Sequence, residues 1–177
     1  MSSVYFVSDL HLGHRTILQH CPQRGGRTVE AHDMWVIEQM LSVNPNRRTL
    51  WWVLGDVSME VSCLELLDKV PGRKRLVLGN HDLFDTQVYL KYFEIVHGMV
   101  KKYQMWLSHA PIHPAELRGK PNVHGHCHAE QINDVRYWNM AIEHLPDMKP
   151  MSLEQVRDVW QARAAAIARM TRISITE

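Results

Sequence analysis

The sequence predicts an α+β fold of the α/β sandwich type, in which helices pack against β-sheets. Three features support this prediction: strand-like and helix-like segments alternate in the first half, the second half is dense in strand-like segments, and a long helical segment comes last. Of the 177 residues, 45% are apolar and 22% are charged, which suffices for one hydrophobic core. We therefore expect a single domain over residues 1–177.

Six short apolar runs that end in small or polar residues predict β-strands. They span residues 4–8, 50–54, 75–78, 105–108, 122–124 and 137–140. Segments 32–41 and 61–70 carry apolar residues near helical spacing, so we predict helices there that pack on a sheet. The breaker pair Pro71-Gly72 is expected to end the second helix.

A long C-terminal helix is predicted to begin at Ser152 and to close the domain. Gln155 follows Ser152 at the spacing of a capping box, in which each side chain bonds the other residue's backbone. The apolar residues that would share one face of this helix are Leu153, Val156, Trp160, Ala164 and Ile167.

Segment 21–31 is the best candidate for a mobile loop, because it places Arg24 and Arg27 beside a Gly25-Gly26 hinge. Two roles are open for these arginines. They could clamp a phosphate group, but loop arginines are more often solvated, and we favour the solvated role.

Charge and cysteine content exclude some classes of protein. The net charge of +1 gives no strongly basic field, so binding to long duplexes is disfavoured, while contact with a nucleic-acid end stays open. The three cysteines, Cys21, Cys63 and Cys127, lie far apart and predict neither a disulfide framework nor a thiolate zinc site. The first residues lack a basic lead-in, and no run approaches the ~20 apolar residues of a membrane span, so we expect a cytoplasmic protein without a membrane partner.

Polar clusters follow five of the predicted strands, and they contain many of the 12 histidines. The clusters are Ser8-Asp9-Leu10-His11, Gly55-Asp56, Gly79-Asn80-His81-Asp82, His109 and Gly125-His126-Cys127-His128. Because side chains at the carboxyl ends of strands project into one crevice, we expect a single site.

The spacing within two of these clusters predicts how their side chains point. In extended backbone, residues two apart face the same way, so Asp9 and His11 would converge, as would His126 and His128. Carboxylate, imidazole and amide ligands without thiolate suit Mn, Fe, Co, Ni or Zn. The glycines at 55, 79 and 125 would let the backbone pass close to the metals.

In this order the five clusters resemble the signature of the calcineurin-like metallophosphoesterase superfamily, which runs D-x-H, G-D, G-N-H-D/E, H and G-H-x-H. Segments 8–14 and 137–140 resemble the small stand-alone bacterial and phage members, and the resemblance spans roughly residues 4–160. It implies a four-layer architecture, with two facing β-sheets flanked by helices.

The resemblance also implies a role for each site residue. Two divalent metal ions would be held, one by Asp9, His11, Asp56 and His128, and the other by Asp56, Asn80, His109 and His126. Asp56 would bridge the ions, and His81 would approach the phosphate as a hydrogen-bond donor or general acid. Two such cations about 3.5 to 4 Å apart can lower the pKa of a shared water toward ~7. The expected reaction is hydrolysis of a small phosphate ester by this metal-activated water.

One position departs from the family pattern. Many phosphatases of the superfamily extend the second block to G-D-x-x-D, where the second Asp orients the catalytic histidine; Met59 stands there in this chain. Diester cleavage is therefore favoured over monoester cleavage.

Three points stay open at the level of sequence. A nuclease acting on nucleic-acid ends would need a basic or aromatic track to the site, and the chain shows only scattered basic groups. A non-catalytic metal-binding scaffold would lack the catalytic histidine, whereas His81 is present. His14 could cap the next helix or touch substrate.

Overall fold

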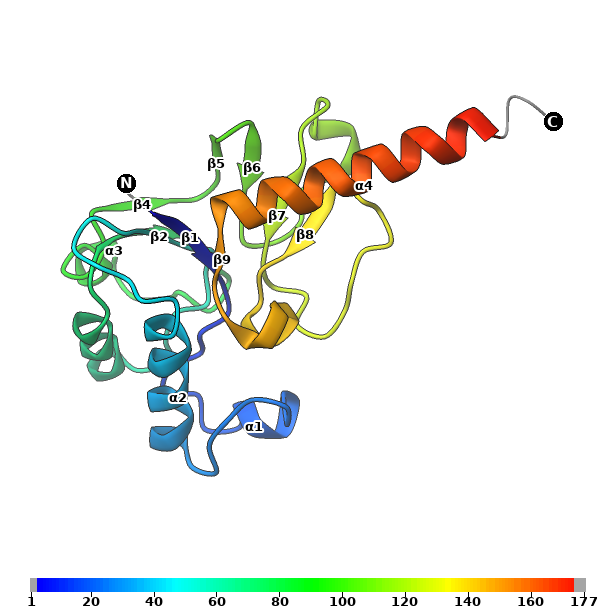
Figure 1. The fold of residues 1–177 in the computed structure, drawn as a ribbon. Helices are drawn as coiled ribbons and strands as arrows, with labels where there is room; N and C mark the ends of the chain where they lie inside the picture. The colour runs from blue at the N-terminus through cyan, green and yellow to red at the C-terminus, as the bar shows by residue number, and fades with distance from the viewer. Residues whose placement is uncertain (1–2, 174–177) are drawn as a thin grey trace.

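The structure, a computed structural model, describes residues 3–173, which form two β-sheets with helices around them (Figure 1). The first sheet has the order β4-β3-β2-β1-β9 and the second the order β5-β6-β7-β8. The strands are β1 (Val4–Val7), β2 (Leu50–Val53), β3 (Arg73–Val77), β4 (Ile95–His97), β5 (Val100–Lys102), β6 (Met105–Leu107), β7 (Asn122–His124), β8 (Tyr137–Asn139) and β9 (Met151–Ser152). The predicted sandwich of two sheets is confirmed.

Parallel pairing brings the carboxyl ends of the central strands to one edge of each sheet. Strands β1 to β4 pair in parallel, as do β6, β7 and β8, whereas β9 and β5 are antiparallel additions at an edge. The two edges are joined just past β1 and β8, where the Ser8 N–H donates to the Met140 carbonyl at 2.8 Å. Segments that follow strands of both sheets therefore reach the same place.

The six predicted strands are all present, with ends that differ by at most two residues. Strand β2 is buried along its whole length, with Trp51 and Trp52 fully enclosed in the core. The prediction missed β4, β5 and β9, which have only two or three residues each. Exposed residues such as Ile95 and Lys101 give these strands no buried pattern, so only pairing with a neighbour defines them.

Both predicted internal helices are found, with corrected limits and type. Helix α2 (Val29–Leu41) begins three residues before the predicted start, because the Thr28 hydroxyl accepts a hydrogen bond from the Ala31 N–H. The second is a 3₁₀ helix, η1 (Val61–Lys69), which ends before Pro71-Gly72 as expected. The shorter helices are α1 (Ile17–His20), α3 (Thr86–Tyr89), η2 (Pro114–Glu116), η3 (Ile142–His144) and η4 (Pro146–Met148).

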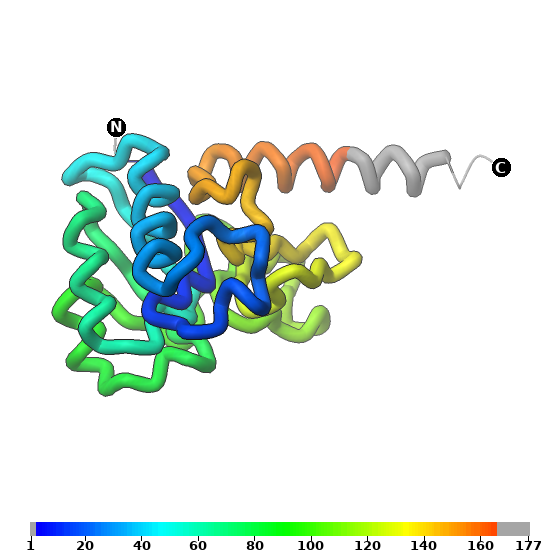
Figure 2. The backbone as a smooth tube through the Cα atoms, turned by 90° about the horizontal axis from the view of Figure 1, so that it is seen from below, coloured from blue at the N-terminus to red at the C-terminus, as the bar shows by residue number. Residues whose placement is uncertain are grey.

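The C-terminal helix α4 (Leu153–Ile173) begins with the predicted capping box. The Ser152 N–H donates to Gln155 Oε1 at 2.7 Å, and the Gln155 N–H donates to Ser152 Oγ at 3.1 Å. Val156 is buried, but Ala164 is exposed, and the side chain of Ile167 lies outside the described residues. Figure 2 shows α4 beginning against the body of the domain, where Val156 packs into the core and the Arg163 guanidinium lies over Trp138 of β8.

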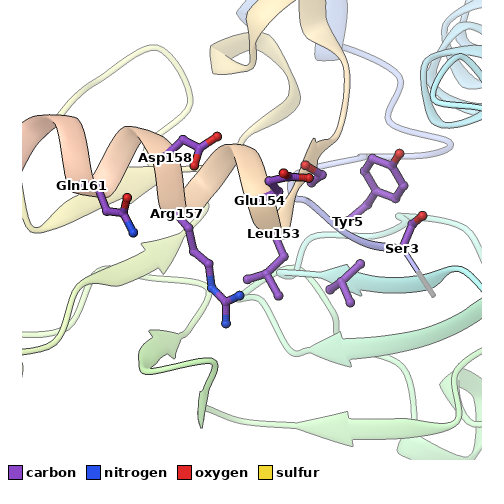
Figure 3. Close-up of a pocket in the computed structure, with 9 residues that line it drawn as sticks. Ser3, Tyr5, Leu153, Glu154, Arg157, Asp158 and Gln161 are labelled. Carbon is purple, nitrogen blue, oxygen red and sulfur yellow. The ribbon is translucent and has the colours of Figure 1, made fainter. Parts of the chain in front are cut away.

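The first turns of α4 also border a cavity of about 560 Å³ at the start of β1 (Figure 3). Tyr5, Leu153 and Arg157 are among the residues that line it. This cavity lies at the amino end of β1, whereas the polar clusters follow the carboxyl ends of the strands. We therefore place the functional site elsewhere. Within residues 3–173, no helix has the length and apolar character needed to cross a membrane.

Candidate metal centre

The structure brings the seven predicted metal ligands together where the two sheets meet. Two groups are distinguished: the first cluster is Asp9, His11 and His128, and the second cluster is Asp56, His109 and His126. Within each cluster the potential ligand atoms all lie within 4.8 Å of one another. Each cluster could therefore hold a metal ion.

Asp56 faces both clusters. Its Oδ2 atom lies 3.7 Å from His11 Nε2 in the first cluster and 3.3 Å from His109 Nε2 in the second. Its other oxygen, Oδ1, accepts a hydrogen bond from the His81 backbone N–H at 2.9 Å, which fixes the carboxylate plane. Asn80 Oδ1 lies 3.0 Å from His109 Nε2 and so extends the second cluster.

His11 is a buried imidazole whose polar atoms have no hydrogen-bond partner. It is 2% exposed, and neither ring nitrogen makes a hydrogen bond within the described part of the chain. Burial lowers the pKa of His11 more than Asp9 raises it, so the ring is neutral and Nε2 or Nδ1 offers a lone pair. An unpaired buried polar group is costly, and a cation between His11 and the two carboxylates would remove that cost.

His109 offers a lone pair for a similar reason. Its Nδ1 lies 2.8 Å from the Leu54 carbonyl, which can only accept, so Nδ1 holds the proton. In a neutral His109 the Nε2 lone pair then faces Oδ2 of Asp56 and Oδ1 of Asn80. All three atoms are hydrogen-bond acceptors, and none of them carries a proton. Burial lowers the pKa of His109, but the hydrogen bond with Asp56 and the charges of both aspartates raise it above the ordinary value. A proton or a metal ion is thus needed at this point, and the ligand set fits a metal.

Both aspartates carry negative charge at neutral pH. Burial raises the pKa of Asp9, but the nearby imidazoles of His11 and His109 lower it below its ordinary value. Burial also raises the pKa of Asp56, but His109 and the hydrogen bond from the His81 N–H together lower it below its ordinary value. Two buried carboxylates among imidazoles form a site that favours cations.

The backbone at the site differs from the extended conformation that we expected. Five of the seven predicted ligands have positive φ angles: Asp9 (58°), His11 (50°), Asp56 (53°), His126 (71°) and His128 (43°). Each such residue costs on the order of 1–3 kcal/mol and persists only where its surroundings hold it. Here the surroundings include hydrogen bonds from the Asp9 N–H to the Gly55 carbonyl and from the His11 N–H to the Asp56 carbonyl.

The expected convergence of residues two apart holds for only one pair. Asp9 and His11 share the first cluster, but His126 belongs to the second cluster and His128 to the first. All four residues have left-handed backbone, so the alternation rule for strands applies to neither pair, and the convergence of Asp9 and His11 does not follow from it.

The glycines at 55, 79 and 125 make room for ligand side chains, which refines the expectation that they make room for the metals. A Cβ atom added at Gly55 would overlap the ring of His109. A Cβ atom added at Gly79 would overlap Oδ1 of Asp56. One added at Gly125 would overlap Oδ2 of Asp9. A side chain at either of the last two positions would push a carboxylate out of the site.

Asp82 supports the site without facing it, a role that sequence reasoning did not assign. Its carboxylate accepts hydrogen bonds from the N–H groups of Gly79, Asp56 and Val57 at 2.8 to 2.9 Å. These bonds tie the segment after β2 to the segment after β3. The signal was present, because Asp82 completes the G-N-H-D block, but the sequence did not show what its side chain contacts.

Glu143 and Arg24 form a second support that sequence reasoning missed. Glu143, in η3, belongs to none of the five blocks, yet its Oε1 lies 2.6 Å from His128 Nδ1. Arg24 is 3% exposed and pairs with Glu143, so the expectation that it is solvated or clamps a phosphate is wrong. The Cys21 thiol and Glu143 raise the pKa of His128 to about 10.

The candidate catalytic histidine lies at the solvent side of the centre. His81 is exposed, and its ring centroid is 5.7 Å from that of His11. Among residues 3–173 no carboxylate hydrogen-bonds to the His81 ring, in keeping with Met59 at the position of the orienting Asp.

His14 lies next to the centre. The His14 ring is 5.4 Å from the His11 ring, and His14 Nδ1 accepts a hydrogen bond from the Thr16 N–H. His14, Arg15 and Arg27 line a cavity of about 420 Å³. The N-cap of α1 is Thr16, so His14 does not cap this helix; its ring borders the centre, and contact with substrate stays a prediction.

Comparison with known proteins identifies the class that this fold and site define. The sequence model of the calcineurin-like phosphoesterase family matches residues 2–163. The chain belongs to this family, whose members carry out metal-dependent phosphoester hydrolysis.

Individual relatives agree with that assignment. The Gene 66 protein of Mycobacterium phage D29 is 37% identical over 198 aligned residues, covering 90% of this chain and 96% of that protein. The Gene 66 protein of Mycobacterium phage L5 is 38% identical over 87 residues, which cover 46% of this chain and 41% of the relative. The uncharacterized protein MJ1445 of Methanocaldococcus jannaschii is 25% identical and covers 88% of this chain and 90% of its own.

A solved structure shares the fold. The protein of unknown function AQ665 from Aquifex aeolicus superposes with a TM-score of 0.72 at 22% sequence identity. The match covers 90% of this chain and all of the other one. At this identity the likeness supports the fold alone.

Proposed function

We propose that this protein is a dinuclear metal-dependent phosphoesterase that hydrolyses small phosphate esters and prefers diesters to monoesters. The observation that carries the proposal is the position of Asp56 Oδ2, between the Nε2 atoms of His11 and His109. One carboxylate oxygen that faces two separate clusters is the arrangement that two neighbouring cations require.

The ligands divide into two sets that share Asp56. Asp9, His11 and His128 would hold one ion with Asp56, and Asn80, His109 and His126 would hold the other with Asp56. The nitrogen and oxygen donors suit Mn, Fe, Co, Ni or Zn. When bound, such ions lower the pKa of a shared water toward ~7 and neutralise charge on the phosphoryl oxygens.

The protein itself orients the segment that carries Asn80 and His81, and it supplies a proton donor. Asp82 and the Asp56–His81 hydrogen bond fix the segment that carries both Asn80 and His81. His81, exposed beside the first cluster, would donate a proton to the leaving oxygen. Because no carboxylate in the described part of the chain hydrogen-bonds to its ring, proton donation would be weak, and substrates whose leaving groups need little protonation would be cleaved best.

Nucleic acid is the less favoured substrate, because the chain has a net charge of only +1. The substrate would bind from the exposed side of the centre, beside His81. A cavity of about 420 Å³ that His14, Arg15 and Arg27 line adjoins the centre through His14. A cavity of this size suits a small ester group.

Metal analysis and kinetics together test the proposal. Elemental analysis of protein saturated with Mn²⁺ or Zn²⁺ should give two ions per chain. Across a panel of monoesters, cyclic nucleotides, dinucleotides and oligonucleotides, kcat/KM should be higher for an activated diester than for an alkyl monoester. A stoichiometry of one or zero would contradict the dinuclear centre, and a clear preference for alkyl monoesters would contradict the diester assignment.

A further inference from the structure

A buried pair of opposite charges lies directly behind the first cluster. The side chains of Arg24 and Glu143 are 0% and 1% exposed. Arg24 Nη2 and Nε both donate to Glu143 Oε2, and the other oxygen, Oε1, faces His128 Nδ1 at 2.6 Å. The pair therefore contacts the back of a metal-site histidine from a position that substrate cannot reach.

We propose that Glu143, held in place by Arg24, is a positioning residue that directs His128 Nε2 toward the metal of the first cluster. The inference rests on the proposed function, because it concerns the same metal centre. Glu143 can only accept, so a neutral His128 must carry its proton on Nδ1, which leaves the lone pair on Nε2. Nε2 lies 3.7 Å from Asp9 Oδ1, inside the first cluster.

Arg24 also fixes the segment that carries Asp9 and His11, the other two ligands of the first cluster. Its Nη2 donates to the Asp9 carbonyl at 2.8 Å and its Nη1 to the Leu10 carbonyl at 3.4 Å. These carbonyls belong to the strained segment in which Asp9 has a φ of 58°. One guanidinium group therefore holds both the D-x-H segment and, through Glu143, the last histidine of the signature.

The far side of Arg24 is anchored as well. Its Nη1 lies 3.4 Å from His32 Nε2, and His32 Nδ1 lies 3.0 Å from Asp33 Oδ1. The other oxygen of Asp33 accepts a hydrogen bond from the Gly13 N–H at 2.8 Å. The start of α2 is thus linked to the first cluster through buried polar contacts.

Two other roles for these residues fit the structure less well. Arg24 cannot bind a substrate phosphate, because its guanidinium is enclosed and already paired. Cys21 Sγ, His128 Nδ1 and Glu143 Oε1 also lie within 4.8 Å of one another, as they would around a further cation. The positive charge of Arg24 on the same carboxylate opposes a cation there.

The test compares Mn²⁺ binding in four proteins by calorimetry, starting from metal-free protein. In the wild type we expect two ions per chain. In Glu143→Met one of the two sites should weaken by about 10- to 100-fold, the usual effect of losing the partner of a ligating histidine. Glu143→Gln should weaken it less, because the Gln carbonyl can still accept the Nδ1 proton. Glu154→Gln, an exposed change in α4, is the matched control and should bind like the wild type.

A double variant separates positioning from folding. Glu143→Met alone leaves the Arg24 charge buried without its partner, so the variant could misfold for that reason alone. Arg24→Met combined with Glu143→Met removes both charges and should regain part of the stability lost in Glu143→Met, although the Asp9 and Leu10 carbonyls lose their donor, and its weaker site should stay weak. If the double variant regains both wild-type affinities, the pair is only structural and the inference is wrong.

The outcomes also distinguish this inference from the proposed function. A wild type that binds no Mn²⁺ or a single ion would overturn the dinuclear centre and the inference together. A wild type with two sites and a folded Glu143→Met variant with unchanged affinities would overturn the inference alone.

Discussion

The two clusters of the metal centre are supported in different ways. Behind the first cluster, His128 contacts Glu143, which is buried and paired with Arg24, a residue 119 positions away in the chain. Behind the second, His109 contacts the Leu54 carbonyl, and His126 is exposed. The first cluster depends on side chains that lie outside the five motifs, whereas the second depends on groups within or next to its own motifs, the Leu54 carbonyl and the Asp82 carboxylate.

This difference predicts how each cluster responds to change. Substitution of Arg24 or Glu143 should weaken metal binding by the first cluster and should also lower the stability of the fold, because a buried ionic group costs free energy once it loses its partner. Loss of an exposed ligand from the second cluster should weaken metal binding alone. Four variants test this contrast.

Asp56→Ala should have the largest effect, because Asp56 faces both clusters. It removes the shared carboxylate and leaves the repulsion between two cations uncompensated, so both metal content and activity should fall. We expect a loss of rate beyond the roughly 10⁴-fold upper end for a missing general acid, on good and poor leaving groups alike. Metal analysis and kcat on graded leaving groups check this. Retention of two ions would refute the bridging role.

His81→Ala should have a smaller effect on the rate and should leave metal binding by both clusters unchanged. The ions should remain, while the rate falls by about 10²- to 10⁴-fold, or roughly 2.7 to 5.4 kcal/mol of transition-state stabilisation. The loss should shrink for substrates with good leaving groups, which need little protonation. If His81→Ala loses its metals, or keeps full activity on a poor leaving group, the assignment of His81 is wrong.

Glu143→Gln should change the pH dependence of stability through the first cluster. Burial raises the pKa of Glu143, but His128 and Arg24 lower it from 4.5 to about 2. A depressed folded pKa stabilises the fold above pH 4.5, and this contribution disappears as the pH falls toward 2. Its size is about 3 kcal/mol.

Urea unfolding of metal-free protein between about pH 6 and pH 3 measures that contribution. The difference in unfolding free energy between the wild type and Glu143→Gln should narrow as the pH falls through this window. A difference that stays constant would show that the Glu143 charge does not stabilise the fold.

His126→Ala should have the smallest effect on the fold, because this ligand of the second cluster is exposed. The unfolding free energy of metal-free protein should change by less than about 1 kcal/mol. Calorimetry should nevertheless show that one Mn²⁺ site has weakened. A large loss of stability would mean that the second cluster, like the first, supports the fold, and the contrast between the clusters would fail.

Much of the fold could be predicted because its central strands carry their own signal. Strand β2 is buried throughout, and its apolar run predicts a strand without knowledge of its neighbours. Strands β4, β5 and β9 are short, and their residues show no periodic burial, so pairing with β3, β6 and β1 defines them. Such pairing depends on contacts between distant segments, which a local pattern does not contain.

The sequence by itself determined which seven side chains gather at the site, because their five blocks follow strands whose carboxyl ends share an edge. Only the tertiary structure decided how they are held. The left-handed backbone at Asp9 and His128 and the burial of Arg24 against Glu143 arise when the two sheets close on one another. Spacing along a chain can predict the direction of a side chain only while the backbone is regular, and at this site the packing of distant segments makes it irregular.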